Sequence, residues 1–226
     1  MREKIWYLKR INLFIGMSKE ELDVIAKMSR EKIYKKKQVI YLPSDPDNTI
    51  FMIKTGKVKL YVISEDGKKF TFAILEPGEI FGELALIDDT HRDTVAEAYE
   101  DTYICVMNKT DFTNLIKKNP DMALKVTKLI GFRLKVIENN IQNLIFKNSK
   151  AKLAELILRL KDRFGINDQR GTFINLKITH QELADLTGLT RETVTYTLND
   201  FKNTDMIEII DKRIIVKKES ELKRVQ

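Results

Sequence analysis

The chain has 226 residues, 43% of them hydrophobic and 32% charged, which is the composition of a folded globular protein of one or two domains. Its 40 lysines and arginines exceed its 33 aspartates and glutamates, and the net charge of +7 permits an anionic partner without requiring one. The single cysteine, Cys105, excludes an internal disulfide and a cysteine-held metal or iron–sulfur cluster within one chain. The histidines His91 and His180 are far apart in sequence and cannot form a metal site alone.

The first half of the chain predicts a helical segment followed by antiparallel strands. Residues 1–27 carry a helical period, and Ser18 with Glu21 fits a capping box. Between about residues 33 and 107 apolar residues alternate with others, as in Val58, Leu60 and Val62 against Lys57, Lys59 and Tyr61, and later in Phe70, Phe72 and Ile74. Asp66-Gly67 is a hairpin signal, and the regular prolines and glycines suit an antiparallel sandwich or barrel. Cys105 lies in an apolar strand and is interpreted as a core residue rather than a reactive thiol.

A helix of nearly thirty residues is predicted to begin at Pro120, with Asn119 as its cap. The residues that follow a 4-3 rhythm along it are Val126, Ile130, Arg133, Ile137, Asn140 and Leu144. A single apolar stripe on so long a helix favours pairing with a second helix. The two polar residues in this seam favour a specified pairing or contact with a ligand. The alternative is a helix that lies on its own barrel.

The last third of the chain has a third pattern, and four apolar residues predict a short amphipathic helix: Leu153, Leu156, Ile157 and Leu160. The segment Gly165–Asn175 is interpreted as a polar loop or turn. Thr179 with Glu182 predicts a capping box that opens one helix, Gly188 predicts a turn, and Thr190 caps the next helix. Two short apolar strands are expected around Asp211-Lys212.

Two helices joined by a glycine turn and followed by a hairpin predict a winged helix–turn–helix, whose second helix presents its start to the major groove of DNA. The expected buried stripe of that helix is Val194, Leu198 and Phe201, so that Glu192, Thr195, Tyr196 and Asn199 face outward beside Arg191. Arginine can donate two hydrogen bonds to guanine and glutamate can accept one from cytosine, each worth about 1–3 kcal/mol of discrimination. The further DNA-binding candidates are Thr179, His180, Gln181, Thr190 and Lys212, with Arg213, Lys217 and Lys218 available to phosphates.

The segment ITHQELADLTGLTRETVTYTL resembles the recognition segment of the cAMP receptor protein/fumarate–nitrate regulator (Crp/Fnr) family of bacterial transcription factors. PGEIFGELAL and the long helix after Asn119-Pro120 extend the resemblance over nearly the whole chain. The resemblance implies an α+β fold with an N-terminal antiparallel β-roll, a cyclic-nucleotide-binding-like jelly roll, over residues 1–118. A dimerisation helix over 119–148 and a winged helix–turn–helix over 149–226 would follow. Arg191 and Glu192 match two of the family's base readers, whereas Tyr196 replaces the third, an arginine, which implies a different half-site.

FGELALIDDTHRDT resembles the family's phosphate-binding cassette, which cradles a cyclic phosphate with helix amides and an arginine. Glu83, after Gly82 and before Leu84, matches the acid that takes a ribose hydroxyl, and Arg92 matches the phosphate-binding arginine. Asp93 replaces a serine that touches the phosphate, and two like charges at about 4 Å repel by about 4 kcal/mol, against about 1 kcal/mol for a lost hydrogen bond. Ile137 replaces the threonine that meets the adenine. We therefore predict that cAMP is not a tight ligand.

Arg133 suggests an anionic effector at the dimer interface, because the nitrogen-control branch of the family, which senses 2-oxoglutarate, has an arginine placed similarly. The C-terminal half also resembles that branch, whereas the cassette with Glu83 does not. The effector candidates are a cyclic nucleotide or a 2-oxoglutarate-like anion, and the alternative is a regulator without a ligand that is controlled by its abundance. Arg92 has the alternative role of an ion-pair partner of Asp93, Asp88 or Asp89. The missing cysteines argue against haem and iron–sulfur sensing.

We expect double-stranded DNA, a second copy of the chain and RNA polymerase as partners. A cytoplasmic location without membrane contact is expected, because the sequence has neither a signal-peptide core nor a run of about 18 apolar residues. The alternative function is a ligand-binding signalling module that does not bind DNA. An enzyme is disfavoured, because no catalytic triad, metal-ligand set or phosphate loop is recognisable.

Overall fold

The computed structural model describes residues 6–46, 48–86 and 92–225. The chain divides into two compact units, one made of residues 1–67 and 71–135 and the other of residues 68–70 and 136–226. The long helix α4 (Pro120–Phe146) begins in the first unit and ends in the second. Each unit is described by itself below.

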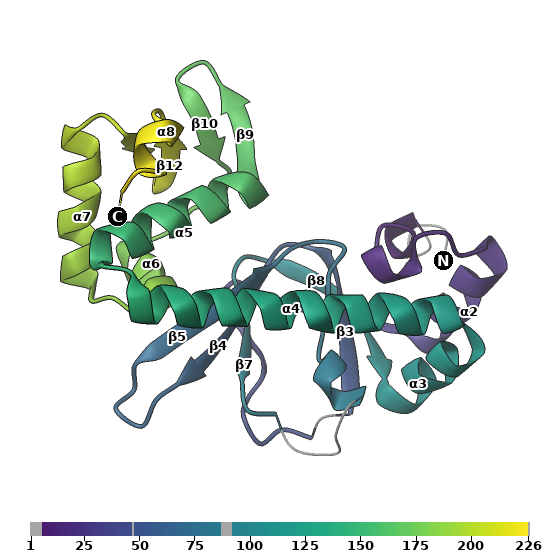
Figure 1. The fold of residues 1–226 in the computed structure, drawn as a ribbon. Helices are drawn as coiled ribbons and strands as arrows, with labels where there is room; N and C mark the ends of the chain where they lie inside the picture. Colours follow the sequence, from purple (N-terminus) through teal and green to yellow (C-terminus); the bar gives the residue numbers. More distant parts are fainter. Residues whose placement is uncertain (1–5, 47, 87–91, 226) are drawn as a thin grey trace. The chain divides into compact units, whose positions relative to one another are not determined.

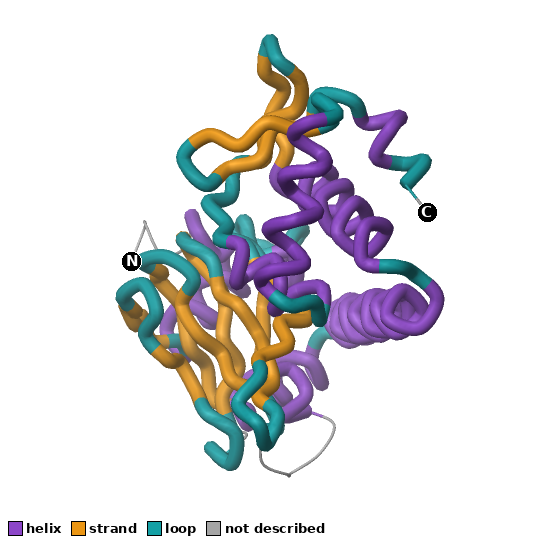
Figure 2. The backbone as a smooth tube through the Cα atoms, turned by 90° about the vertical axis from the view of Figure 1, so that its left-hand side faces the viewer, coloured by secondary structure: helices purple, strands orange, loops and turns teal. Residues whose placement is uncertain are grey.

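The first unit is built on two four-stranded sheets with the strand orders β1-β8-β3-β6 and β2-β7-β4-β5 (Figures 1 and 2). The strands are β1 (Arg30–Tyr34), β2 (Val39–Tyr41), β3 (Thr49–Thr55), β4 (Val58–Ile63), β5 (Lys69–Leu75), β6 (Ile80–Phe81), β7 (Val95–Ala98) and β8 (Thr102–Asn108). The helices are η1 (Asn12–Phe14), α2 (Lys19–Met28), η2 (Glu83–Leu86) and α3 (Lys109–Lys118), with α4 following. The predicted antiparallel β structure is confirmed, since β1, β3, β6 and β8 pair antiparallel, as do β2, β4 and β7.

Two apolar cores hold this unit together. One lies between the sheets and includes Phe51, Val58, Phe81 and Ile104. The other joins the sheet of β3 and β8 to the helices, and its members include Leu22, Ile50, Met107, Phe112 and Met122. Cys105 belongs to this second core and is 2% exposed, which confirms its interpretation as a core residue. The helices therefore cover one sheet, while the two sheets cover each other.

The local signals for helix and turn are confirmed, and the alternation along β4 is only partly right. Ser18 and Glu21 form both bonds of a capping box at the start of α2. Along β4, Val58 and Leu60 are buried as expected, but Tyr61 is buried too and Val62 is exposed. Because β7 pairs with β4 only as far as Tyr61, the residues beyond it extend past their neighbouring strand. The Tyr61 hydroxyl donates to Glu97 of β7 at 3.0 Å, which satisfies its polar end.

Helix α4 spans 27 residues, and the side chain of Asn119 accepts a hydrogen bond from the amide of Met122 at 3.2 Å, as predicted for its cap. The predicted seam is wrong in part. Val126 and Ile130 pack against the first unit's own core, and Arg133 and Asn140 make contacts within the chain. The helix also exposes Leu124, Phe132 and Phe146. A further exposed apolar stripe consists of Leu134, Ile137, Ile141 and Ile145, of which Ile137 belongs to the predicted seam. Their spacing of three, four and four residues places them on one face of the helix.

The second unit contains α5 (Ser149–Phe164), β9 (Gly165–Asp168), β10 (Gly171–Ile174), α6 (His180–Thr187), α7 (Arg191–Asn203), β11 (Ile207–Ile210), β12 (Arg213–Val216) and α8 (Glu219–Leu222). Its sheet has the order β11-β12-β10-β9, and α5 packs against α6, α7 and this sheet. The predicted helices and the two final strands are confirmed. The interpretation of Gly165–Asn175 as a polar loop is wrong, because Gly165–Asp168 and Gly171–Ile174 pair as an antiparallel hairpin. Only Ile174 of β10 is fully buried, which explains why the segment looks polar.

Candidate nucleic-acid interface and effector site

The helix–turn–helix rests on caps that the sequence itself supplies. The Thr179 hydroxyl accepts a hydrogen bond from the Glu182 amide at 3.2 Å, and the Glu182 carboxylate accepts one from the Thr179 amide at 2.7 Å. Gly188 closes α6 in the left-handed conformation, with φ of 67°. The Thr190 hydroxyl then accepts from the amide of Thr193 at 3.2 Å and begins α7. The turn between the helices is therefore fixed by short-range bonds.

Helix α7 has one buried face and one free face. Val194, Leu198 and Phe201 are at most 2% exposed, as the spacing predicts. Arg191, Glu192 and Asn199 are exposed, and Tyr196 is 72% exposed, although it is a large aromatic residue. No partner of the Arg191 or Glu192 side chain is recorded among the residues that the structure describes. Two charged groups and an aromatic ring thus face outward along the first turns of α7.

A hydrogen-bonded link joins the starts of the two helices. The Thr195 hydroxyl donates to the backbone carbonyl of Arg191 at 2.9 Å, and Nδ1 of His180 lies 2.8 Å from the same hydroxyl oxygen. Since that hydroxyl proton is already used, His180 must supply the proton of this second bond. Burial lowers the pKa of His180, and the charges of Arg191 and Lys202 lower it further. His180 is therefore neutral near pH 7 and acts by hydrogen bonding rather than by charge.

The same region forms a cleft of about 360 Å³. Its polar lining consists of Thr179, His180, Gln181, Arg191 and Lys212, and its apolar floor includes Leu198 and Ile214. Gln181 donates to Asp185 at 2.8 Å, so its amide is held in place along α6. The structure thus brings together most of the predicted DNA-binding residues, with two cations in one cleft and without a carboxylate in its lining.

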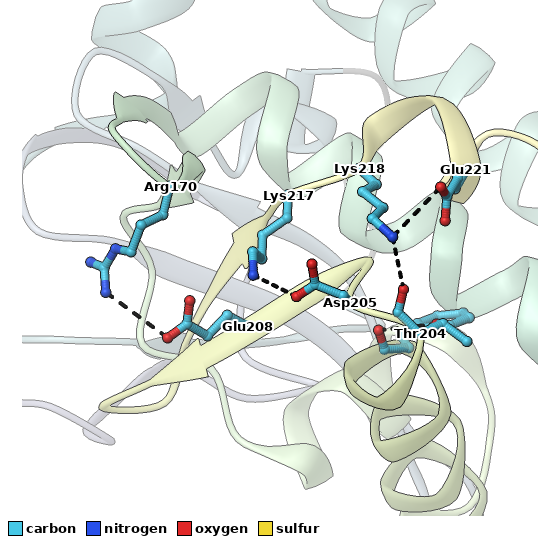
Figure 3. Close-up of polar contacts among 8 residues, drawn as sticks. Arg170, Thr204, Asp205, Glu208, Lys217, Lys218 and Glu221 are labelled. Atoms are coloured by element: carbon cyan, nitrogen blue, oxygen red, sulfur yellow. Dashed lines mark hydrogen bonds and ion pairs between the residues drawn. The ribbon is translucent and has the colours of Figure 1, made fainter.

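The basic residues of the wing, which the sequence analysis treats as one group, differ in whether an acidic residue pairs with them. The turn between β11 and β12 has positive φ at Asp211 and Lys212, which are 47° and 60° and suit a tight hairpin. The Lys217 ammonium lies 2.5 Å from Asp205, and Lys218 lies 3.7 Å from Glu221 and donates to the carbonyl of Thr204 (Figure 3).

Arg213 is 3.4 Å from Asp211. No such partner is recorded for Lys212 among the described residues, so the side chains predicted to reach phosphates divide into paired and unpaired cations.

The candidate effector site lies in the first unit, where the chain turns from β6 into η2. Gly82 has φ of 79°, and a Cβ there would lie 2.7 Å from the carbonyl oxygen of Thr49, so only glycine fits. Glu83 is 3% exposed. One of its carboxylate oxygens pairs with Arg133 of α4, which also donates to the carbonyl of Ile80, while its buried Oε2 has no hydrogen-bond partner.

Arg92 is buried beside this group. Its guanidinium donates to the carbonyl of Thr49 at 2.9 Å and lies 4.1 Å from the ring centre of Tyr41 and 5.3 Å from that of Phe51. Such stacking stabilises a cation in a partly dry site. Burial raises the pKa of Tyr41, and its bond to Thr94 and the charge of Arg92 oppose this.

The other predicted effector residues are less enclosed. Leu84 is 57% exposed, Asp93 is exposed, and Ile137 of α4 is 43% exposed. Asp88, Asp89 and His91 lie outside the described residues. Sequence reasoning missed Tyr41, Phe51 and the carbonyl of Thr49, because they come from strands more than forty residues away from Arg92 and carry no motif of their own.

In the part of the chain that the structure describes, no group of three or more histidine, cysteine, aspartate or glutamate residues could hold a metal ion. Over the same residues, no helix is both long enough and apolar enough to span a bilayer.

The comparisons with known proteins agree with this geometry. Residues 31–119 match the cyclic nucleotide-binding domain family, and residues 151–225 match the Crp-like helix-turn-helix domain family. The chain is 29% identical over 202 residues to the cyclic AMP receptor protein of Thermus thermophilus. The aligned residues make up 89% of this chain and 90% of that protein. It is 29% identical over 193 residues to the global nitrogen regulator of a Nostoc species, covering 84% and 86% of the two chains.

Among solved structures, a CooA mutant from Carboxydothermus hydrogenoformans is similar with a TM-score of 0.80 and 31% identity, over 94% of each chain. This similarity extends over both of the matched domains. The chain therefore belongs to the Crp/Fnr family and is a DNA-binding transcription regulator.

Proposed function

We propose that the regulator is a homodimer that reads a palindromic operator through α7. The observation that carries this proposal is the exposed start of α7, where Arg191 and Glu192 project from a face whose opposite side is fully buried. Arg191 would take a guanine, Glu192 a cytosine, and Tyr196 would contact the third position. Thr179, His180, Gln181, Thr190, Thr195 and Lys212 would position the phosphates around them.

The proposed dimer interface is the exposed stripe of α4. Leu134, Ile137, Ile141 and Ile145 are between 43% and 66% exposed. Covering these side chains with a second copy would remove a contiguous apolar surface from water. The expected operator then has two half-sites about 34 Å apart, because two copies of α7 enter successive major grooves.

The proposed effector is a small anion that binds near Glu83, Arg92 and Arg133. Two arginines and one carboxylate give this group a positive balance, and the unpartnered oxygen of Glu83 would accept a donor from the ligand. Asp93 and Ile137 disfavour cAMP for the reasons given by the sequence. A cyclic nucleotide of another type and a 2-oxoglutarate-like acid remain the candidates, and the alternative is control by abundance.

The proposed organisation keeps three parts, with the effector domain over residues 1–118, the dimerisation helix over 119–148 and the DNA-binding domain over 149–226. We propose a cytoplasmic protein that acts on transcription together with RNA polymerase, and we assign it no catalytic role. The family is defined by regulation of transcription rather than by an enzyme class.

Selection of duplexes from a random library by the full-length chain, followed by fluorescence anisotropy on the selected sequence, tests the DNA-binding proposal. A two-fold symmetric consensus bound by a dimer is expected. A consensus without symmetry, or binding as a monomer, would contradict it. Thermal shift with a panel of nucleotides and 2-oxo acids tests the effector proposal, and isothermal titration that shows submicromolar cAMP binding would overturn the exclusion of cAMP.

A further inference from the structure

A group of polar side chains joins the last turns of α4 to α5, outside both sites described above. Arg159 of α5 donates to the side-chain oxygen of Asn140 at 2.5 Å, and Asn143 donates to Glu155 at 2.8 Å. The other carboxylate oxygen of Glu155 pairs with Lys147. We call Asn140, Asn143, Lys147, Glu155 and Arg159 the α4–α5 clamp.

The spacing of these residues makes the clamp directional. Asn140, Asn143 and Lys147 follow one another at intervals of three and four residues, so they lie on one side of the chain before α5. Glu155 and Arg159 are four residues apart and lie on one side of α5. Asn140 pairs with the later of the two α5 residues and Asn143 with the earlier one, so the helices run past each other in opposite directions. Only Lys147 and Asn148 separate the two helices, and the Asn148 side chain caps α5 by accepting from the Ala151 amide at 2.9 Å.

Arg159 is an unusual choice for a group of this kind. Its Nε is buried without a hydrogen-bond partner, and no carboxylate pairs with its guanidinium among the described residues. Burial lowers its pKa. A half-buried cation with a neutral partner adds little to stability, whereas polar groups of this kind can specify one geometry among several.

Helix α5 connects the α4–α5 clamp to α7, the helix that is proposed to enter the major groove. It packs against α6 and α7, and its buried residues include Leu153, Leu156 and Ile157. The ammonium of Lys150 in the first turn of α5 lies 2.5 Å from Asp200 of α7. A change in the angle between α4 and α5 would therefore move α7 with it.

We propose that the α4–α5 clamp sets the direction in which the helix–turn–helix leaves the end of α4, and that it thereby selects the spacing between the two half-sites. This inference rests on the proposed function, because spacing has a meaning only for a dimer on a two-fold operator. Asn140, Glu155 and Arg159 are positioning residues on this account, since they act on DNA through α5 and α7.

The test uses duplexes that carry two copies of the selected half-site at separations varied in steps of one base pair. The full-length wild type should bind one separation about tenfold or more better than its neighbours. Asn140→Leu and Arg159→Met remove the bond between the helices, and each should reduce this preference about fivefold, which is the effect of one hydrogen bond. Asn140→Asp gives Arg159 a carboxylate partner at the same place and should retain the preference.

Asn139→Leu is the matched control, because Asn139 is exposed on the same helix, one position away. Thermal unfolding and the penalty for one mismatched base in a half-site show whether a variant is folded and still reads sequence. If the clamp variants keep the wild-type spacing preference while folded, or lose mismatch discrimination in equal measure, the clamp has no positioning role. A folded wild type that binds no duplex at any separation would instead overturn the proposed function, and this inference with it.

Discussion

The two kinds of wing lysine allow a matched experiment on phosphate contacts. Lys212 lines the cleft beside Arg191 without a recorded acidic partner, whereas Lys217 is 2.5 Å from Asp205, which raises the pKa of Lys217 through their hydrogen bond. Lys212→Ala and Lys217→Ala each remove one positive charge from the same hairpin. The two variants therefore have the same net charge, and they differ only in whether the removed ammonium was paired with a carboxylate.

The expected magnitudes follow from counterion release. One phosphate contact contributes a slope of about −0.9 to the dependence of log K on log salt, which corresponds to about fivefold in affinity near 0.15 M salt. Lys212→Ala should lose about that much on every sequence and reduce the slope by about one. Lys217→Ala should leave the slope unchanged, because its ammonium is already neutralised within the chain.

Fluorescence anisotropy on the selected operator and on an unrelated duplex, at four or five salt concentrations, measures both quantities. Equal reductions of slope in the two variants would refute the division into paired and unpaired cations. A loss confined to the operator in Lys212→Ala would instead show that Lys212 reads bases and not phosphates.

Three further predictions concern other residues. Arg191→Ala should relax specificity at one base pair of each half-site by about 1–3 kcal/mol, measured with operators that carry each of the four bases there; an equal loss for all sequences would contradict the assignment. Arg133→Ala leaves the buried Glu83 carboxylate without its partner and should lower the free energy of unfolding by about 1–3 kcal/mol in urea titration, and an unchanged midpoint would show that the pair adds nothing. Lys161 and Lys223 lower the pKa of Glu219 from 4.5 to about 2, and a depressed carboxyl pKa stabilises the fold above the unfolded value and ceases to do so as pH falls through the folded one. Glu219→Gln should therefore lower the melting temperature at pH 7, with a difference from wild type that shrinks between about pH 4.5 and 2; a difference independent of pH would contradict the linkage.

Much of the recognition unit could be predicted because its signals are short-range. Thr179 with Glu182, and Thr190 with the amide of Thr193, act within three residues, and Gly188 needs only its own backbone conformation. A period of three to four residues then separates the buried Val194 and Leu198 from the exposed Arg191. Each of these features can be read from a window of about ten residues.

The errors occur where a distant element decides the outcome. Gly165–Asn175 looked like a loop because its strands have few buried residues, and its pairing with β12 involves Thr172 and Val216, far apart in sequence. Asn140 and Arg133 fit a seam by spacing, but Arg159 and Glu83 bind them within the chain. Spacing along one helix predicts which residues share a side and cannot predict what lies opposite.

Helix α4 belongs to both units, since Met122 and Val126 lie in a core of the first unit while Asn140 and Asn143 are hydrogen-bonded to α5 in the second. Inserting a single alanine between Arg133 and Asn140 would rotate the helix residues after it by about 100° relative to those before it, because the helix has 3.6 residues per turn. Seven inserted residues would bring the later helix residues nearly back to their original face and lengthen α4 by about 10 Å.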